Sequence, residues 1–454
     1  MNKVLLFYPN AEDKAHWLPY AILTLGTILA DNEFEVVLID EVLYAENPRE
    51  IEKIVEQNIE DTLFVGISSF IGNQIRNGLK FAKIIRTYNC KVPIVWGGWH
   101  PSILKEVTIK SEYVDFIIQG QGELIILELA NKLVSKDNRF SDIDGLIYMD
   151  NGLIKVNKER KFVQRSELPN YNWELIDVKK YIVEDKAISD KTVSYISSQG
   201  CPLNCGFCSE NAMYKRGWYA NTAYQMYDDI NFLLKNYDID GISFYDSNFT
   251  VDKKRILTFC ELVIRSDLKF KWAAAADILF LRGLTNEEWE LLRKSGCTRL
   301  LIGAESGSEK ILNLIGKKFK PKDVIDISEK SIEFGISLYF TMIVGWPENP
   351  IDDFQKTKEL IESIREKTLE HEFIIHIYAP FIGTPLYQYA CENGYIPPKT
   401  LEDWANYDYY KITTPWISKE FLEKVEDYRM HLNISYNMNK NRKKYKKDIV
   451  DRGE

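Results

Sequence analysis

Three cysteines lie close together near the middle of the chain, in the segment 198–210, which reads SQGCPLNCGFCSE. They are Cys201, Cys205 and Cys208, in the pattern C-x3-C-x2-C. Because the chain has only seven cysteines, this spacing is expected by chance about 0.002 times in a chain of this composition. Thiolates held this close converge on one metal centre, and sulfur ligands suit zinc or an iron–sulfur cluster. The alternative is a loop of three reduced cysteines without a metal.

The number of ligands separates the two kinds of metal centre. Structural zinc normally takes four ligands, and no fourth Cys or His lies nearby in the sequence. A cubane of iron and sulfide held by three thiolates instead keeps one iron open for a substrate or a cofactor. Pro202 and Gly206 suit a tight loop around such a cluster. The pattern therefore favours a [4Fe–4S] cluster bound by Cys201, Cys205 and Cys208.

With Phe207 before the last cysteine, the motif resembles that of radical S-adenosylmethionine enzymes. In that family the open iron binds the amino and carboxylate groups of S-adenosylmethionine. The reduced cluster then splits the sulfonium to give a 5′-deoxyadenosyl radical. The resemblance also implies an electron donor such as flavodoxin or ferredoxin. This chain departs from many relatives at Gln199, where they have Arg.

Length and charge limit the classes of protein that the chain can belong to. Its 454 residues are enough for two to three domains. A net charge of −9 argues against a nucleic-acid-binding surface. No apolar run approaches the roughly 18 residues of a membrane span, and the N-terminus leads directly into a short strand-like run without a signal peptide. With few cysteines, these features predict a cytoplasmic protein in a reducing compartment.

Strand and helix patterns alternate through the first part of the chain. Short β-rich runs at 4–8, 35–39, 63–68, 92–96 and 116–118 alternate with helical apolar spacing, for example at 18–30 and 74–87. This alternation predicts a doubly wound, Rossmann-like parallel sheet. Ligands bind such sheets at the carboxyl ends of the strands, and glycines there let the backbone approach a large ligand closely.

Two of these strand ends, GGWHP at 97–101 and GQGE at 120–123, resemble the cobalamin-binding domain that precedes the radical domain in one large subgroup of the family. The D-x-H-x-x-G motif that supplies a cobalt ligand elsewhere is absent from the sequence. We interpret His16 and His100 as hydrogen-bonding loop residues rather than cobalt ligands. The alternative is a degenerate Rossmann-like domain without a ligand. The cobalamin contacts implied by the resemblance are Ser68, Ser69, Gly97, Gly98, Trp99, His100, Gly120, Gly122 and Glu123.

A second alternating region follows a connector. Residues 146–149 and 153–156 flank Asp150-Asn151-Gly152 and predict a β-hairpin. Strands are predicted at 192–197, 241–245, 270–275, 299–302, 336–344 and 373–378. Six such units make a partial, TIM-like (β/α)6 barrel with its site at the C-terminal strand ends. We therefore expect a cobalamin-binding domain at 1–135, a linker at 136–190, a radical barrel at 191–395 and a short helical C-terminal region at 396–454.

The barrel's strand ends also resemble the radical family, in the stretches FYDSNFT, GAESGS, IVGWPEN and PFIGTPLY. The contacts to S-adenosylmethionine that this likeness implies are Phe207, Asp246, Glu305, Ser306, Val344 and Gly345. Two positions depart from the family pattern: Ser247 replaces a frequent Asp, and 273–276 is a run of alanines where relatives carry a basic residue. The aromatic residues of the C-terminal region suit either a cover over the barrel or ordinary packing: Trp404, Tyr407, Tyr409, Tyr410 and Trp416.

Three functions fit these features. The first is methylation of an unactivated carbon of a small molecule, lipid or peptide, with cobalamin as the methyl carrier. The second is a radical cyclisation, rearrangement or oxidation without methyl transfer. The third is a non-catalytic cofactor sensor. The sequence identifies neither the substrate nor a catalytic acid or base.

Overall fold

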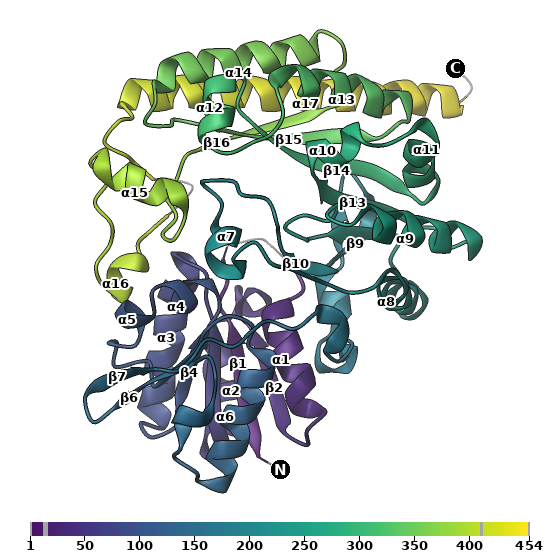
Figure 1. Ribbon diagram of the computed structural model, residues 1–454. Coiled ribbons are helices and arrows are strands. Elements are labelled where there is room, and N and C mark those ends of the chain that lie inside the picture. The colour runs from purple at the N-terminus through teal and green to yellow at the C-terminus, as the bar shows by residue number, and fades with distance from the viewer. Residues whose placement is uncertain (1, 12–16, 409–411, 453–454) are drawn as a thin grey trace.

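The computed structural model describes residues 2–11, 17–408 and 412–452, with side chains up to residue 440. Figure 1 shows two α/β units, with the N-terminal one below and the C-terminal one above, and the segment around β10 and α7 between them. None of the described helices has the length and apolar character needed to cross a membrane.

The first sheet has the strand order β2-β1-β3-β4-β5-β6-β7. Its five parallel strands are β1 (Lys3–Tyr8), β2 (Glu35–Asp40), β3 (Thr62–Ser68), β4 (Ile94–Gly97) and β5 (Phe116–Ile118). The helices between them include α1 (Tyr20–Ala30), α2 (Arg49–Asn58), α3 (Asn73–Tyr88), α4 (Trp99–Ile103) and α6 (Glu123–Ser135). The doubly wound sheet is therefore confirmed. The strand order reverses between β1 and β3, which is where such sheets bind ligands.

Alternate residues of the central strands pack into different cores. Val4 and Leu6 lie with residues of α1 and α6 on one face of the sheet. Leu5 and Phe7 belong to the larger cluster on the other face, which continues into the second unit. Both faces are buried, as expected of a parallel sheet.

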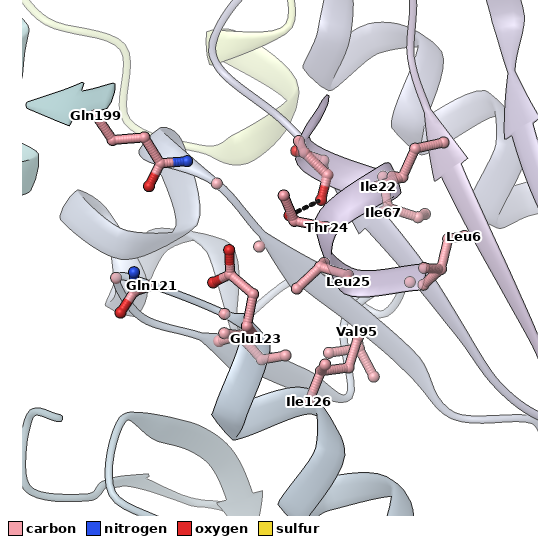
Figure 2. Close-up of a pocket in the computed structure, with 18 of the residues that line it drawn as sticks. Leu6, Ile22, Thr24, Leu25, Ile67, Val95, Gln121, Glu123, Ile126 and Gln199 are labelled. Carbon is pink, nitrogen blue, oxygen red and sulfur yellow. Dashed lines mark hydrogen bonds between the residues drawn. The ribbon is translucent and has the colours of Figure 1, made fainter. Parts of the chain in front are cut away.

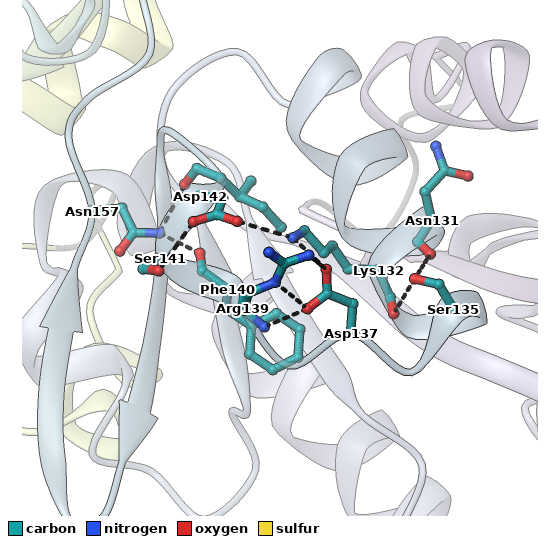
Figure 3. A network of polar contacts seen from close by, with 10 residues as sticks. Asn131, Lys132, Ser135, Asp137, Arg139, Phe140, Ser141, Asp142 and Asn157 are labelled. Atoms are coloured by element: carbon teal, nitrogen blue, oxygen red, sulfur yellow. Dashed lines mark hydrogen bonds and ion pairs between the residues drawn. The ribbon is translucent and has the colours of Figure 1, made fainter.

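The predicted hairpin is present as β6 (Leu146–Asp150) and β7 (Leu153–Val156), and it extends the first sheet through antiparallel pairing of β6 with β5. Asn151 and Gly152 both have positive φ, as a two-residue hairpin turn requires. Figure 3 shows the polar network that joins the hairpin to the end of α6. Lys132 contacts Asp137 and Asp142 at 2.8 and 3.2 Å, and Asn157 Nδ2 donates to the carbonyl of Phe140 at 2.6 Å.

The second sheet has the order β16-β15-β14-β13-β12-β9-β8. Its six parallel strands are β9 (Ser189–Tyr195), β12 (Gly241–Phe244), β13 (Lys271–Ala276), β14 (Cys297–Glu305), β15 (Ser337–Val344) and β16 (Glu372–Ile377), with β8 (Val183–Asp185) antiparallel at the edge. Helices α8 (Ala223–Asn236), α9 (Lys253–Arg265), α11 (Asn286–Lys294), α13 (Pro321–Glu333) and α14 (Pro350–Arg365) separate them. This arrangement confirms the six-stranded partial barrel.

The C-terminal region closes one edge of the barrel. Helix α17 (Lys419–Arg452) runs along β16, and Arg429 Nε donates to the carbonyl of Ile375 at 2.7 Å. Trp404 and Tyr407 are buried, and Trp416 Nε1 donates to the carbonyl of Gly345 at 2.9 Å. These aromatics pack as part of the fold, whereas Tyr409 and Tyr410 lie outside the described residues.

Candidate active site between the two domains

The three cysteines lie on a loop between β10 (Ser198–Gly200) and α7 (Ser209–Tyr214). Two segments from distant parts of the barrel domain hold its backbone. Gly206 N donates to the carbonyl of Ile315, and the carbonyl of Gly206 accepts from Leu386 N, both at 2.9 Å. A Cβ on Gly206 would lie 3.2 Å from Leu386 Cγ, so glycine suits this close approach. The loop is therefore fixed by the fold.

The surroundings of the three thiols fit an iron–sulfur cluster. Cys205 is buried, Cys201 and Cys208 are partly buried, and Asn248 Nδ2 lies 3.6 Å from Cys201 Sγ. Burial raises the pKa of all three thiols, that of Cys208 to about 12. Bound iron offsets this cost, because a metal ion deprotonates a coordinating thiol. Within the described part of the chain, no three Cys, His, Asp or Glu side chains are grouped as ligands of a single ion, whereas a cubane takes each thiolate on a different iron.

Asp246 fixes the start of the cysteine loop. It is buried, and its Oδ1 accepts from the backbone N–H groups of Ser197 and Ser198 at 2.6 and 2.9 Å. Its Oδ2 accepts from the Ser197 hydroxyl at 2.5 Å, and Arg255 Nη2 donates to the same hydroxyl. Both carboxylate oxygens thus bind protein groups. The structure brings Asp246 to the loop that carries Cys201, in a position that supports the loop.

Glu305 lies at the end of β14 in an unusual backbone conformation. Its φ is +62°, a region that residues other than glycine seldom adopt. The side chain is buried, and Oε1 lies 3.0 Å from Nζ of Lys317, whose side chain is 10% exposed. Backbone strain of this kind is frequent at functional sites. Glu305 is therefore a well-fixed carboxylate beside the cysteine loop.

The other residues predicted to contact S-adenosylmethionine differ in their surroundings. Ser306 is fully buried and donates to Asp353, while its Oγ accepts from Ser308 N at 2.9 Å. Val344 is fully buried, and Gly345 has a φ of +81°. Phe207 meets Trp346 edge-on, with ring centroids 5.7 Å apart. Of these residues, Phe207 is the one whose side chain borders the cavity described next.

A cavity of about 540 Å³ opens between the cysteine loop and the last two barrel strands. Phe207, Cys208 and Ser209 form one side, and Ile343 of β15 with residues of β16 forms another. Arg429 and Asn433 of α17 close the edge. A second cavity of about 380 Å³ is lined by Ser243 to Ser247, Ala273 to Ala275, Arg299, Leu301 and Tyr339. The small side chains of the alanine run therefore form part of the wall of this cavity.

The first domain has its own cavity, of about 140 Å³, at the reversal of strand order (Figure 2). Most of its wall is aliphatic, and its polar side chains include Gln121, Glu123 and Gln199, which lie toward one side in Figure 2. Six of the predicted cobalamin contacts line it: Ser68, Gly97, Gly98, Gly120, Gly122 and Glu123. Burial raises the pKa of Glu123, and the nearby Arg165 opposes this shift.

Three predicted cobalamin contacts lie outside that lining. Trp99 is buried and donates from Nε1 to the carbonyl of Ser209 at 3.1 Å. The interpretation of His100 as a hydrogen-bonding loop residue is wrong: it lies in α4, fully buried against Trp404, and neither ring nitrogen has a hydrogen-bond partner among the described residues. Burial lowers the pKa of His100 to about 3. Ser69 is buried and its backbone N–H donates to Gly97. His16 lies outside the described residues.

Sequence reasoning missed several residues of these sites. Met213 and Tyr214 of α7 line the cavity of the first domain, although they belong to the segment that follows the cysteines. Gln199 lines the same cavity, and its only mark in the sequence was that many members of the family have Arg at this position. Lys317 could not be identified from the sequence, because it belongs to none of the recognised motifs and its ion pair with Glu305 forms only in the folded chain. Residues 199, 213 and 214, which flank the three cysteines in the sequence, therefore form part of the wall of the first domain's cavity.

Comparison with known proteins gives two family matches. A model of the radical SAM superfamily matches residues 195–361, and a model of the B12 binding domain matches residues 10–130. An uncharacterized methyltransferase of Pyrococcus horikoshii is 27% identical over 86% of this chain and 84% of its own length. The anaerobic magnesium-protoporphyrin IX monomethyl ester cyclase of a Synechocystis strain is 24% identical over 80% of this chain and 72% of its own.

Two solved structures share the fold. The radical S-adenosylmethionine methyltransferase TsrM from Kitasatospora setae superposes with a TM-score of 0.71 at 17% identity, over 87% of this chain and 76% of that one. The cobalamin-dependent S-adenosylmethionine radical enzyme OxsB gives a TM-score of 0.68 at 21% identity, over 87% and 55%. At these identities the likeness concerns the fold, which is the expected order of a B12-binding domain and a radical SAM barrel.

Proposed function

Because the chain belongs to the radical S-adenosylmethionine enzymes that carry a B12-binding domain, we propose that it methylates an unactivated carbon atom of its substrate. Its cofactors are a [4Fe–4S] cluster, S-adenosylmethionine and cobalamin. When bound, the cluster would supply the electron for cleavage of S-adenosylmethionine to a hydrogen-abstracting radical, and cobalamin would supply the methyl group. The substrate is a small molecule, a lipid or a peptide, and the electron donor is a flavodoxin or ferredoxin of the cytoplasm.

The observation that carries this proposal is that residues on both sides of the cysteine loop line the cavity of the first domain. Gln199 lies two positions before Cys201, and Met213 and Tyr214 lie shortly after Cys208. All three line the cavity of the first domain. A group bound in that cavity is therefore close to the cysteine loop. Methyl transfer to a carbon radical needs this proximity, because a radical that waits for a distant donor reacts elsewhere.

We assign each binding role to residues of the chain. Cys201, Cys205 and Cys208 hold the cluster, and Phe207 and Ile343 border the cavity that suits the adenosyl group. Glu305 accepts hydrogen bonds from the ammonium group or the ribose hydroxyls of S-adenosylmethionine. Asp246 supports the cysteine loop. We propose domain limits at residues 135, 190 and 395, with the hairpin of the linker paired to the edge of the first sheet.

The size of the first cavity supports a particular mode of cobalamin binding. At about 140 Å³ it is comparable to the apolar cavity of about 150 Å³ that accepts one benzene. It is too small for a corrin ring and suits the aromatic base of the cofactor's tail. We therefore propose that the residues lining this cavity would hold the aromatic base of the cofactor's tail. Gln121, Glu123 and Gln199 then accept or donate hydrogen bonds to amide groups at the rim.

Incubation of the reconstituted protein with cobalamin and S-adenosylmethionine deuterated in its methyl group tests this function. Transfer of the deuterated methyl group to cobalamin, with formation of 5′-deoxyadenosine, is the expected result. The cyclase relative supports a second candidate, a radical reaction without methyl transfer. That function gives 5′-deoxyadenosine while cobalamin stays unmethylated. Absence of both products contradicts both enzymatic functions and favours a sensor.

A further inference from the structure

A largely enclosed lysine, Lys317, lies beside the cysteine loop. Lys317 follows α12 (Glu309–Leu314), and its side chain is 10% exposed. Its Nζ lies 3.0 Å from Glu305 Oε1 and donates to the carbonyl of Gly303 at 3.1 Å. The same ammonium lies 5.8 Å from the ring centroid of Phe207. Lys317 thus connects the end of β14 with the loop that carries the three cysteines.

Two glycines let the lysine approach both elements. Gly316 has a φ of +81°, and a Cβ there would lie 2.6 Å from the carbonyl oxygen of Asn204, inside the cysteine loop. A Cβ on Gly303 would lie 2.4 Å from Glu305 Oε1 and 3.2 Å from Lys317 Nζ. A side chain at either position would displace the ion pair or the loop. The backbone is therefore adapted to place this pair against the cysteines.

The lysine also balances negative charge around the cysteines. Its Nζ lies 3.0 Å from the buried Glu305 carboxylate and 5.8 Å from the ring centroid of Phe207 in the cysteine loop. Burial alone would lower the pKa of Lys317, but the charge of Glu305 outweighs burial and raises it. The ammonium therefore stays charged at neutral pH, next to the Glu305 carboxylate, whose negative charge it balances.

We propose that Lys317 is a positioning residue that holds the Glu305 carboxylate for S-adenosylmethionine and raises the reduction potential of the cluster. The proposal rests on the function proposed above. Reduction adds one negative charge to the cluster, and a nearby positive charge stabilises the reduced form more than the oxidised form. The ion pair also prevents the buried carboxylate from remaining without a counter-charge.

Anaerobically reconstituted full-length protein allows the test. The variants are Lys317→Met, Lys317→Arg and Glu305→Gln, with Lys310→Met as the control, because Lys310 is a 74% exposed lysine of α12 that pairs with Glu348. Iron and sulfide content, the midpoint potential from an EPR-monitored redox titration, and the Kd for S-adenosylmethionine are measured. These three readouts do not depend on turnover.

We expect Lys317→Met to shift the midpoint to a more negative potential and to weaken S-adenosylmethionine binding about tenfold. Lys317→Arg and Lys310→Met should keep the wild-type potential. Glu305→Gln keeps the ammonium and removes its opposing charge, so its midpoint should move to a less negative potential. If Lys317→Met does not retain a cluster, the midpoint potential of Glu305→Gln decides whether the charge of Lys317 affects the cluster.

The experiment distinguishes failure of the proposed function from failure of the role proposed for Lys317. A wild-type protein that binds no cluster overturns the proposed function and, with it, the role of Lys317. A wild-type protein with about four irons, whose midpoint is unchanged in both Lys317→Met and Glu305→Gln, overturns the role of Lys317 alone.

Discussion

The indole nitrogen of Trp99 donates a hydrogen bond of 3.1 Å to the carbonyl oxygen of Ser209. Trp99 follows β4 in the first domain, and Ser209 follows Cys208 directly, so this bond joins the sheet of one domain to the cysteine loop of the other. The Trp99 ring also meets Phe70 and Phe381 edge-on, with centroids 5.2 and 6.0 Å apart. A residue expected to contact cobalamin therefore contacts the cysteine loop.

Replacement of Trp99 by Phe should loosen the cysteine loop. The change removes one partly buried hydrogen bond, which contributes about 1 kcal/mol, and keeps an aromatic ring between the domains. We expect the reconstituted cluster to be lost several-fold faster to an iron chelator. The decay of the cluster's visible absorption after chelator addition measures the rate.

Trp96→Phe is the matched control for this prediction. Trp96 is fully buried in the neighbouring strand segment and donates from Nε1 to the carbonyl of Tyr113 at 3.0 Å, within the first domain. Its loss should destabilise that domain without a change in the rate of cluster loss. Equal rates for the Trp99 and Trp96 variants would show that the interdomain bond does not protect the cluster.

Most of the strands were predictable because they are locally encoded. Their residues are β-branched or aliphatic runs bounded by glycine or polar tips, and both sheets formed as expected. Strand limits were less predictable: β4 begins at Ile94 rather than at residue 92, since Pro93 has no N–H for the sheet. The turn at Asn151-Gly152 predicted the hairpin, but nothing local identifies β5 as the partner of β6. Strand pairing across the sequence depends on tertiary packing.

The residues of the candidate sites divide in the same way, into those that local sequence identifies and those that only tertiary contacts bring together. Glycine tips and the cysteine spacing follow from local backbone requirements, and six of the nine cobalamin residues line the cavity of the first domain. Ser306 has the expected location, but its hydroxyl is engaged by Asp353 and Ser308. The pairing of Lys317 with Glu305 depends on a turn at Gly316 that packs on Asn204. Such contacts exist only after the chain has folded.

The three motif cysteines should be individually required for the cluster. Replacement of Cys201, Cys205 or Cys208 by Ala removes one of three thiolate ligands, so iron content and S-adenosylmethionine cleavage should both be lost. Cys90→Ala is the control, because Cys90 is exposed and lies outside the site. Iron and sulfide analysis with detection of 5′-deoxyadenosine measures the effect. Wild-type cleavage in any of the three motif variants would remove the assignment.

Gly98→Ala should weaken cobalamin binding. Gly98 has a φ of +97°, and an added Cβ would lie 2.5 Å from the carbonyl oxygen of Ser69, so the loop at the cavity must shift. We expect the affinity for hydroxocobalamin to fall at least about tenfold, while the iron content of the cluster stays unchanged. Titration with hydroxocobalamin, followed by its visible spectrum, measures the affinity.

Gly97→Ala tests whether this effect is specific to the conformation of Gly98. Gly97 borders the same cavity, but a Cβ there would meet nothing closer than 3.9 Å. Its affinity for hydroxocobalamin should stay close to that of the wild type. Equal loss in both variants would indicate that any added methyl group disturbs the site, and wild-type affinity in Gly98→Ala would contradict the close approach. No binding by the wild-type protein would remove the cobalamin assignment.

His100 should make the first domain sensitive to acid. Burial lowers its pKa to about 3, whereas an unfolded histidine titrates near 6.5. Below that pH the unfolded chain binds a proton that the folded chain does not, so stability falls by about 1.4 kcal/mol per pH unit. Asp40 and Asp353, whose pKa burial raises to about 7, act in the opposite direction. A His100→Leu variant keeps those carboxyls and lacks the imidazole.

The difference between the two proteins therefore isolates the imidazole. Thermal unfolding midpoints of wild type and His100→Leu should be compared at about pH 7 and about pH 5. On acidification the wild type should lose more stability than the variant, by roughly 2 kcal/mol over this interval. His100→Leu also changes packing against Trp404, but that contribution is independent of pH and cancels in the comparison. A difference that stays constant from neutral to acid pH would mean that His100 becomes charged in the folded protein, and it would contradict the burial described above.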